Sequence, residues 1–194
     1  ALNKLGIKTQ LMGKVGADLF GGAVKQLVGN FDPQLVSGMV VDPAVHTSYT
    51  VVINPPQVDR IFLHHAGAND TFVATDVRYE AVAEARLFHF GYPPIMRSMY
   101  QNDGRELVEI FRRAKATGVT TSLDMSLPDP TSASGQADWR AILQATLPYV
   151  DVFLPSAEEI LYMLHRQKFA ELHQAAAGHD VLPLFTPEIL TDLS

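Results

Sequence analysis

Cysteine is absent from all 194 residues of the chain. Its absence excludes disulfides, thiolate catalysis and cysteine-based zinc sites, and it fits a reducing cytoplasm. We also find no signal peptide and no apolar run long enough to cross a bilayer. Lysine and arginine are scattered through a chain of net charge −6, with no basic cluster for a nucleic-acid backbone. We therefore expect a cytoplasmic protein that binds neither membranes nor nucleic acids.

The residues that are present have the composition of a folded domain. Apolar residues make up 47% of the sequence and charged residues 19%, which excludes a disordered chain. A chain of this length can bury the core of one α/β domain. Residues 1–6 resemble the last turn of a helix, and residues 188–194 an amphipathic helix. We interpret the chain as part of a longer protein.

The first third of the chain predicts one helix among several strands. Asp18 is placed to cap a helix over residues 19–28, which follows a strand over residues 9–15. Three further runs are rich in Val, Ile, Thr and Tyr, and Pro-containing turns punctuate them: residues 36–41, 47–53 and 61–64. No helical pattern separates these runs, so they predict β hairpins in a small subdomain over residues 36–66.

From Asp70 onward the pattern alternates between helix and strand. The predicted strands are residues 86–91, 119–125 and 151–154; the predicted helices are residues 103–117, one from Asp138, residues 156–164 and a polar surface helix over 167–178. Alternation of this kind implies βαβ crossovers and a mostly parallel sheet. We predict a three-layer α/β fold with the small β subdomain inserted early. Ligands of such sheets bind beyond the carboxyl ends of the strands.

Two acidic side chains follow predicted strand ends. Asp124 can orient a substrate hydroxyl or a metal-bound water there, or it can make an Asx turn before Pro128. Ser156 and Glu159 have the S-x-x-E spacing of a capping box, which needs no ligand. Glu159 also lies after a strand end, where it can hold a magnesium-bound water. The residues alone leave both alternatives open.

The glycines of residues 13–21 suggest a phosphate-binding loop at first sight. Their spacing matches neither a Walker A sequence nor a dinucleotide-binding fingerprint. Glycines that permit a turn, followed by Asp18 as a helix cap, account for the segment without a ligand.

Histidines and small residues mark the end of the last β-rich run. Adjacent strand residues point to opposite faces, so His64 and His65 cannot bind one metal ion together, although one of them can line a ligand pocket. Gly67 and Ala68 then allow close approach of the backbone, and Asn69 or Asp70 can cap the next helix.

Taken in order, these segments resemble the ribokinase (pfkB) family of sugar kinases. The resemblance is carried by Leu5-Gly6, residues 13–21, Thr47 to Val52, Asp59-Arg60 with Phe62, Gly67-Ala68-Asn69, residues 118–124 with Trp139, and residues 151–159. These are similar to the family's LG, GxVGxDxFG, lid-strand, GA(N/M), GvxxsxD and vDvxxPNxxE segments. The likeness covers nearly the whole chain, and its specificity lies in the ordered set.

The resemblance implies ATP-dependent phosphorylation of a hydroxymethyl group on a sugar or sugar-like substrate, with Mg²⁺ as cofactor. The family's catalytic base is the Asp of a Gly-Ala-Gly-Asp segment, which would follow Ser194, so no catalytic residue is expected within this chain. We therefore expect the 194 residues alone to be inactive. Glu159 matches the Glu that holds magnesium through water, whereas Ser156 replaces the family's usual Asn and puts the details of metal binding in question.

The resemblance and the strand-end rule together define the expected site. Six residues are predicted to bind substrate: Arg60, Gly67, Ala68, Asn69, Tyr92 and Asp124. Tyr92 is chosen for its place, as a hydrogen-bonding ring at a strand end, although a core aromatic would fit as well. Residues 1–194 would form a partial ribokinase-like domain lacking its C-terminal nucleotide-binding part. Its lid strands, within residues 36–66, would favour a homodimer through their apolar faces.

Two other functions are compatible with an α/β domain. A sugar- or nucleoside-binding protein without catalysis would have the same fold but no Gly-Ala-Gly-Asp segment in the full-length protein. A nucleotide-dependent oxidoreductase would need a G-x-G-x-x-G turn after its first strand, and the sequence contains none.

Overall fold

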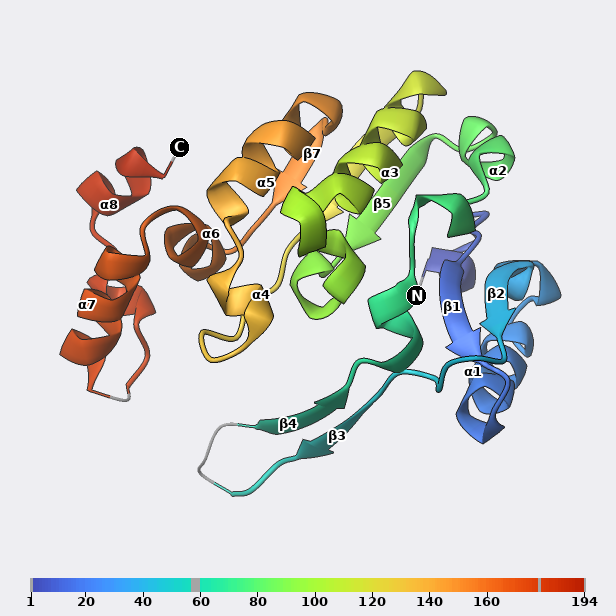
Figure 1. The fold of residues 1–194 in the computed structure, drawn as a ribbon, viewed down its shortest axis with the longest axis horizontal. Coiled ribbons are helices and arrows are strands. Elements are labelled where there is room, and N and C mark those ends of the chain that lie inside the picture. Colours follow the sequence, from blue (N-terminus) through green and yellow to red (C-terminus); the bar gives the residue numbers. More distant parts are fainter. Residues whose placement is uncertain (1, 57–59, 178, 194) are drawn as a thin grey trace. The chain divides into compact units, whose positions relative to one another are not determined.

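The computed structural model describes residues 2–56, 60–177 and 179–193 (Figure 1). Asp59 of the lid-strand motif and Gly178 at the end of a predicted helix lie outside these ranges. The chain divides into two compact units, Ala1–Arg78 and Tyr79–Ser194.

The first unit begins with a strand–helix–strand motif. β1 (Met12–Gly16) leads into α1 (Leu19–Gly29), and β2 (Gly38–Asp42) then pairs in parallel with β1, from Met12 opposite Gly38 to Gly16 opposite Asp42. The expectation that residues 36–41 belong to a hairpin is therefore wrong. A Val-rich strand has the same composition in parallel and antiparallel pairing, and α1 supplies the crossover that parallel pairing needs.

A two-stranded hairpin follows in the same unit. β3 (Tyr49–Ile53) pairs antiparallel with β4 (Ile61–His65), in a register that sets Tyr49 opposite His65 and Ile53 opposite Ile61. Every residue of both strands is exposed. The chain then enters a 3-10 helix, Gly67–Thr71. The prediction of a hairpin over residues 47–64 is confirmed.

The second unit contains a three-stranded parallel sheet in the order β5-β6-β7. Its strands are β5 (Leu87–Gly91), β6 (Thr120–Asp124) and β7 (Val152–Leu154). Its helices are α2 (Tyr79–Ala83), α3 (Arg105–Ala116), α4 (Ala133–Gln136), α5 (Trp139–Thr146), α6 (Ala157–Leu164), α7 (Arg166–Ala176) and α8 (Pro187–Asp192). The predicted strands and their alternation with helices are confirmed.

The core of this unit lies where α3 and α5 cover the sheet (Figure 1). Both helices bury the faces that their apolar spacing predicts: Leu107, Ile110, Phe111 and Ala114 from α3, and Trp139, Ile142 and Leu143 from α5. The Phe111 ring meets the strand residues Phe88 and Phe90 edge-on, with ring centroids 5.9 and 6.2 Å apart. Burial of these side chains is the main term that holds the unit together.

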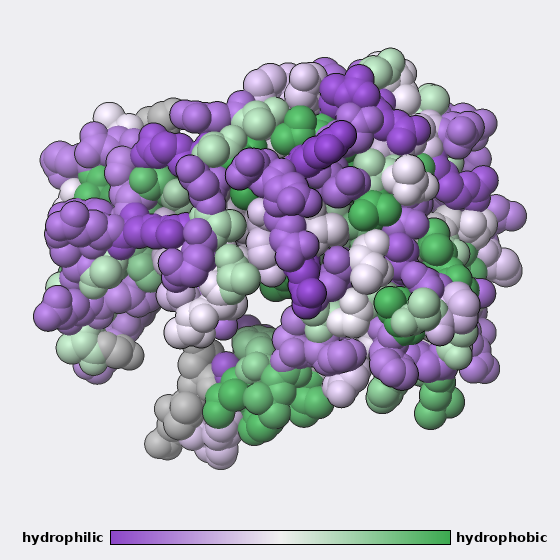
Figure 2. Space-filling model, viewed as in Figure 1, coloured by the Kyte–Doolittle hydropathy of each residue, from purple (hydrophilic) through white to green (hydrophobic). Residues whose placement is uncertain are grey.

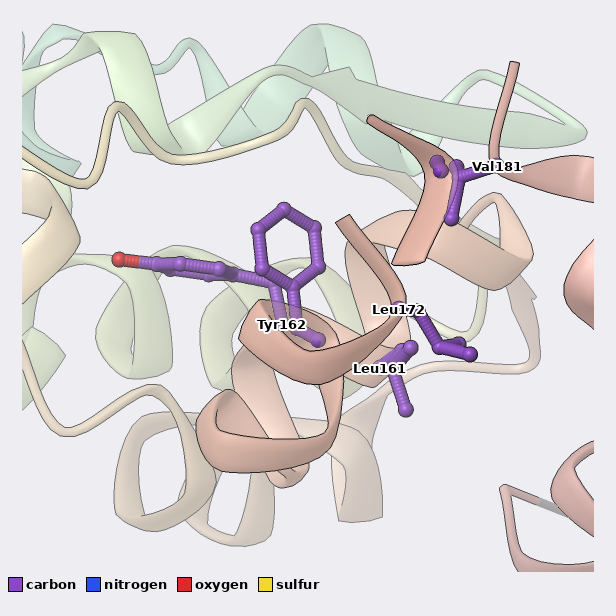
Figure 3. Close-up of a cluster of buried hydrophobic side chains, with 6 residues drawn as sticks. Leu161, Tyr162, Leu172 and Val181 are labelled. Carbon is purple, nitrogen blue, oxygen red and sulfur yellow. The ribbon is translucent and has the colours of Figure 1, made fainter. Parts of the chain in front are cut away.

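A second hydrophobic cluster joins α6 and α7 (Figure 3). It consists of Leu161, Tyr162, Phe169, Leu172, Ala176 and Val181. Tyr162 packs edge-on against Phe169, with ring centroids 4.9 Å apart, and its hydroxyl donates to the carbonyl of Gly135 at 3.0 Å. The helix predicted over residues 167–178 is thus present as α7. The sequence predicts a surface helix here, but one face of α7 is buried.

Candidate substrate site

The Gly67-Ala68-Asn69 turn packs tightly against the chain segment that enters the hairpin. Gly67 has a left-handed φ of +50°, and a Cβ atom at that position would lie 2.4 Å from the His46 carbonyl oxygen. Ala68 is completely buried, and its amide donates to the same carbonyl at 2.8 Å. Only glycine fits at residue 67, because both the backbone conformation and the space exclude a side chain.

Asn69 presents its side chain to the hairpin. Its amide nitrogen Nδ2 donates to Ser48 Oγ at 3.1 Å, and the residue is half-buried. The expectation that Asn69 or Asp70 caps a helix is wrong. Both residues lie inside the 3-10 helix, whose N-cap is Ala66 and makes no side-chain capping bond. The side chain of Asn69 therefore serves the hairpin contact and not a cap.

Asp18 does cap α1, as predicted, through a 2.8 Å bond from the amide of Gly21. Its carboxylate also accepts from the Thr47 amide at 2.8 Å and from the Thr47 hydroxyl at 2.7 Å. The bonds from Thr47, followed by the one from Gly21, lower the pKa of Asp18 from 3.8 to about 2. Asp18 thereby ties the start of α1 to the segment that leads into β3. The sequence signal for this second role is weak: a threonine, Thr47, at the start of a β-rich run.

Lys14 makes a contact that the sequence does not signal. Its Nζ donates to the carbonyl of Thr71 at 2.7 Å and lies 2.7 Å from Asp76 Oδ2. The two side chains are only 8% and 14% exposed. Asp76 also accepts from the amide of Val73 at 2.9 Å, so the ion pair fixes the chain that follows the turn against β1.

Arg60 immediately precedes β4. Its guanidinium carbon lies 5.6 Å from the centroid of the Phe62 ring, within the range of a cation–π contact. The contact with Phe62 thus holds the Arg60 guanidinium against the hairpin. Arg60 is the residue that the sequence analysis assigns to the lid.

In the second unit, the carboxyl ends of the three strands meet at one edge. The parallel register sets Gly91 opposite Asp124 and Asp124 opposite Leu154. Tyr92, which follows β5, donates its amide to the Asp124 carbonyl at 3.1 Å. Tyr92 and Asp124 are therefore neighbours at a strand-end edge, where ligands bind in open parallel sheets.

Tyr92 adopts an unusual conformation for a large side chain. Its φ and ψ of 61° and 46° lie in the left-handed region, and the residue is 50% exposed. Left-handed backbone at a non-glycine residue costs roughly 1–2 kcal/mol. Strained backbone of this kind is enriched at functional positions in proteins, and in Tyr92 it lies at the strand-end edge.

Asp124 and Glu159 differ in how far their carboxylates are used within the chain. Asp124 accepts a 3.0 Å bond from the next amide, that of Met125. Glu159 completes the predicted capping box: its Oε2 accepts from the Ser156 amide at 2.7 Å, and its own amide donates to Ser156 Oγ at 3.2 Å. The predicted capping box of Ser156 and Glu159 is confirmed. Its hydrogen bonds fix the Glu159 side chain just beyond the end of β7.

Glu159 can also serve a metal held through water. Among the described residues its second oxygen, Oε1, makes no bond, and the carboxylate is partly exposed. Carboxylate oxygens suit magnesium, which keeps several of its waters when it binds to protein. Within the described ranges no group of three or more His, Asp or Glu side chains forms a ready cation cage. The free oxygen of Glu159 fits a contact with a metal-bound water.

The seven predicted site residues are divided between the two units. Arg60, Gly67, Ala68 and Asn69 belong to the first unit, and Tyr92, Asp124 and Glu159 to the second. In the first unit, Gly67, Ala68 and Asn69 form the turn at the base of the hairpin, and Arg60 lies at the other end of β4. In the second unit, Tyr92 and Glu159 follow strands and Asp124 ends one.

Comparison with known proteins decides the family. The profile of the pfkB family carbohydrate kinases matches residues 1–188. The chain belongs to this family. Among curated proteins, a sugar kinase from Pyrococcus horikoshii is 25% identical over 165 residues, which cover 84% of this chain and 51% of that protein. The chain thus spans about half the length of the curated relative that it matches.

Solved structures of pfkB-type kinases have the same fold. A fructokinase from Xylella fastidiosa superposes with a TM-score of 0.69 at 21% identity, over 94% of this chain and 52% of that chain. The Pyrococcus horikoshii protein, titled an uncharacterized sugar kinase, gives 0.67 at 22% identity, over 85% and 55%. Both proteins have also been solved with ATP. The predicted ribokinase-like α/β fold is confirmed. None of the helices in the described part of the chain is both long and apolar enough to span a membrane.

Proposed function

We propose that the protein to which this chain belongs transfers the γ-phosphoryl group of ATP to a hydroxymethyl group of a sugar or sugar-like alcohol. The observation that carries the proposal is the pfkB family match over residues 1–188. Relatives solved with ATP support the choice of phosphate donor. A cytoplasmic location, where ATP is abundant, belongs to the same proposal.

The proposal gives each predicted residue a task in this reaction. Phosphoryl transfer depends on positioning and charge neutralisation more than on covalent chemistry. In the proposal Gly67 and Asn69 contact the sugar, and Ala68, whose side chain is buried, supports the turn that carries them. Arg60, before β4, would contact the substrate from the outer end of the hairpin. Gly67 and Asn69 are partly exposed, and Asn69 offers its amide oxygen as an acceptor for a substrate hydroxyl.

Residues at the strand-end edge of the second unit have tasks of their own in the proposal. Tyr92 and Asp124 can bind substrate hydroxyls, because a phenol and a carboxylate both hydrogen-bond to alcohols. Magnesium, when bound, would neutralise charge on the transferring phosphate. Glu159 would hold one of its waters through the oxygen that the capping box leaves free.

A homodimer through the hairpin is the proposed assembly. β3 and β4 expose a group of large side chains: Tyr49, Val51, Val52, Ile53, Ile61, Phe62 and Leu63. The hydrophobic part of this group is the green area at the hairpin in Figure 2. Exposed apolar patches of this kind mark interaction surfaces.

The test is a coupled ADP-release assay of the full-length protein. The acceptors are ribose, fructose, ketodeoxygluconate, tagatose phosphate and nucleosides, each with MgATP, and a reaction without acceptor is the control. We expect ADP release that depends on one class of acceptor. Sugar binding measured by calorimetry without any ADP release would instead identify a binding protein on the same fold.

A further inference from the structure

The two faces of the β3–β4 hairpin differ in chemistry. Side chains alternate between the faces of a strand, and residues in register share a face. One face, here called the apolar face, presents Tyr49, Val51, Ile53, Ile61, Leu63 and His65. The other, here called the mixed face, presents Thr50 opposite His64 and Val52 opposite Phe62. His64 and His65 are neighbours in sequence but project to opposite sides.

The mixed face lies on the side of Asn69. Asn69 Nδ2 donates to Ser48 Oγ, and Ser48 immediately precedes β3. By the same alternation Ser48 and Thr50 project to one side. Thr50 Oγ1 in turn lies 2.8 Å from His64 Nδ1, within hydrogen-bonding distance. Asn69, Ser48, Thr50 and His64 thus form a polar row that starts at the Gly67-Ala68-Asn69 turn and runs out along the hairpin.

The apolar face is fixed on the opposite side by an aromatic stack. The Tyr49 ring lies 5.2 Å from that of His65 and 5.2 Å from that of Phe20, the second residue of α1. His65 therefore packs on an aromatic surface, whereas His64 belongs to the polar row. The orientation of the hairpin faces follows from these contacts alone.

Building on the proposed kinase function, we propose that His64 binds a hydroxyl group of the sugar acceptor and helps to determine which sugar is used. Its Nδ1 is occupied by Thr50, and its Nε2 makes no bond among the described residues. If Thr50 donates to Nδ1, Nε2 carries the proton and donates; if Nδ1 donates to Thr50, Nε2 accepts. A sugar hydroxyl matches either state, because it is both donor and acceptor. Thr50 holds the ring in orientation, and Ser48 and Asn69 extend the same polar surface.

The neighbouring histidine provides a matched control. We expect His64→Ala to raise the KM for the accepted sugar about five- to tenfold, the loss of one hydrogen bond, while KM for ATP stays unchanged. His64→Gln should recover part of the affinity, because its amide reaches the position of Nε2. His65→Ala, on the apolar face, should leave the sugar KM unchanged. Both histidines are exposed, so neither substitution is expected to unfold the protein.

NMR of the unmodified full-length protein gives a second readout. We expect saturating ribose, fructose or ketodeoxygluconate, whichever is accepted, to shift the imidazole signals of His64 and to leave those of His65 in place. Equal effects at both histidines, or none at His64 while the sugar is bound and phosphorylated, would overturn the inference but leave the kinase proposal standing. Failure of the unmodified protein to bind any sugar would overturn both.

Discussion

Lys14 Nζ and Asp76 Oδ2 lie 2.7 Å apart, and neither side chain is more than 14% exposed. Lys14 is on β1, whereas Asp76 lies after the turn that bears Gly67, Ala68 and Asn69. The pair therefore joins the βαβ motif to the segment that follows the proposed substrate residues. Removing one member of a buried ion pair leaves the other charge without compensation, which is costly.

We predict that Lys14→Met lowers the free energy of unfolding by about 3 kcal/mol, because it leaves Asp76 buried without its partner. The double variant Lys14→Met with Asp76→Asn should recover part of this loss, since Asn keeps an oxygen for the Val73 amide. Urea denaturation measures both. Arg112→Ala, which removes an exposed ion pair with Glu109, is the control and should leave stability unchanged. A double variant no more stable than Lys14→Met alone would contradict a coupled pair.

Asp18 predicts a specific sensitivity to acid. Its pKa of about 2 in the folded protein lies below its ordinary value of 3.8, so between these values the unfolded chain binds more protons. The stabilisation from Asp18 is therefore complete above about pH 4 and is lost as the pH falls toward 2. Thermal unfolding followed by circular dichroism should show this loss. Asp18→Asn should be less stable at neutral pH and should lose less stability on acidification. An unchanged slope in that variant would contradict the assignment.

We expect Tyr92 to lower the stability of the fold and to contribute to sugar binding. Asn tolerates the left-handed conformation better than Tyr, so Tyr92→Asn should keep or raise the free energy of unfolding, by up to about 1 kcal/mol. In the full-length protein the same substitution should weaken sugar binding, measured by calorimetry, because it removes the ring from the strand-end edge. Tyr92→Phe retains the ring and the strain, so its stability should match that of the unmodified protein. Unaltered sugar affinity in Tyr92→Asn would remove Tyr92 from the site.

Glu159→Gln separates the two roles of this side chain. Gln can replace Glu in a capping box, so the variant should unfold at nearly the same temperature. It lacks the negative charge for magnesium-bound water, so KM for MgATP in the full-length protein should rise about tenfold. Ser156→Ala is the converse control: it removes the Ser156 Oγ bond to the Glu159 amide and should lower stability with little change in KM. An unchanged KM in Glu159→Gln would confine the residue to capping.

The proposed homodimer depends on the apolar face of the hairpin. Val51→Asp should weaken self-association at least tenfold in sedimentation equilibrium, because a charge would be buried in an apolar contact. Leu182→Asp changes an apolar residue of comparable exposure outside the hairpin, 58% against 48% for Val51, and should have no effect. Equal weakening by both substitutions would indicate a general loss of solubility and not a hairpin interface.

Much of the fold could be predicted because its signals are local. The apolar spacing of α3 and α5, the capping residue Asp18 and the S-x-x-E of Ser156 and Glu159 each act within a few residues of the chain. The pairing of β2 with β1 could not be predicted in the same way. Strand composition does not distinguish parallel from antiparallel partners, and the crossover through α1 became evident only from the register.

The candidate site also has features that local sequence predicts and contacts that it does not. The strand-end positions of Tyr92 and Asp124 follow from the order of strands and helices. The contacts from Lys14 to Asp76 and from Asp18 to Thr47 join residues distant in sequence, so no local pattern predicts them. The polar row on the hairpin likewise required the register of β3 and β4.

Hydrogen bonds hold both arms of the hairpin at its base, next to the βαβ motif. The incoming arm is held at Thr47 by Asp18, and the outgoing arm at Ala68 by the His46 carbonyl, with no room for a side chain at Gly67. These contacts fix the base of the hairpin. Ile53 and Ile61 form the pair of β3 and β4 that lies farthest from this base. Bending of the hairpin about this base would therefore move Ile53 and Ile61 more than it moves Thr47 or Asn69.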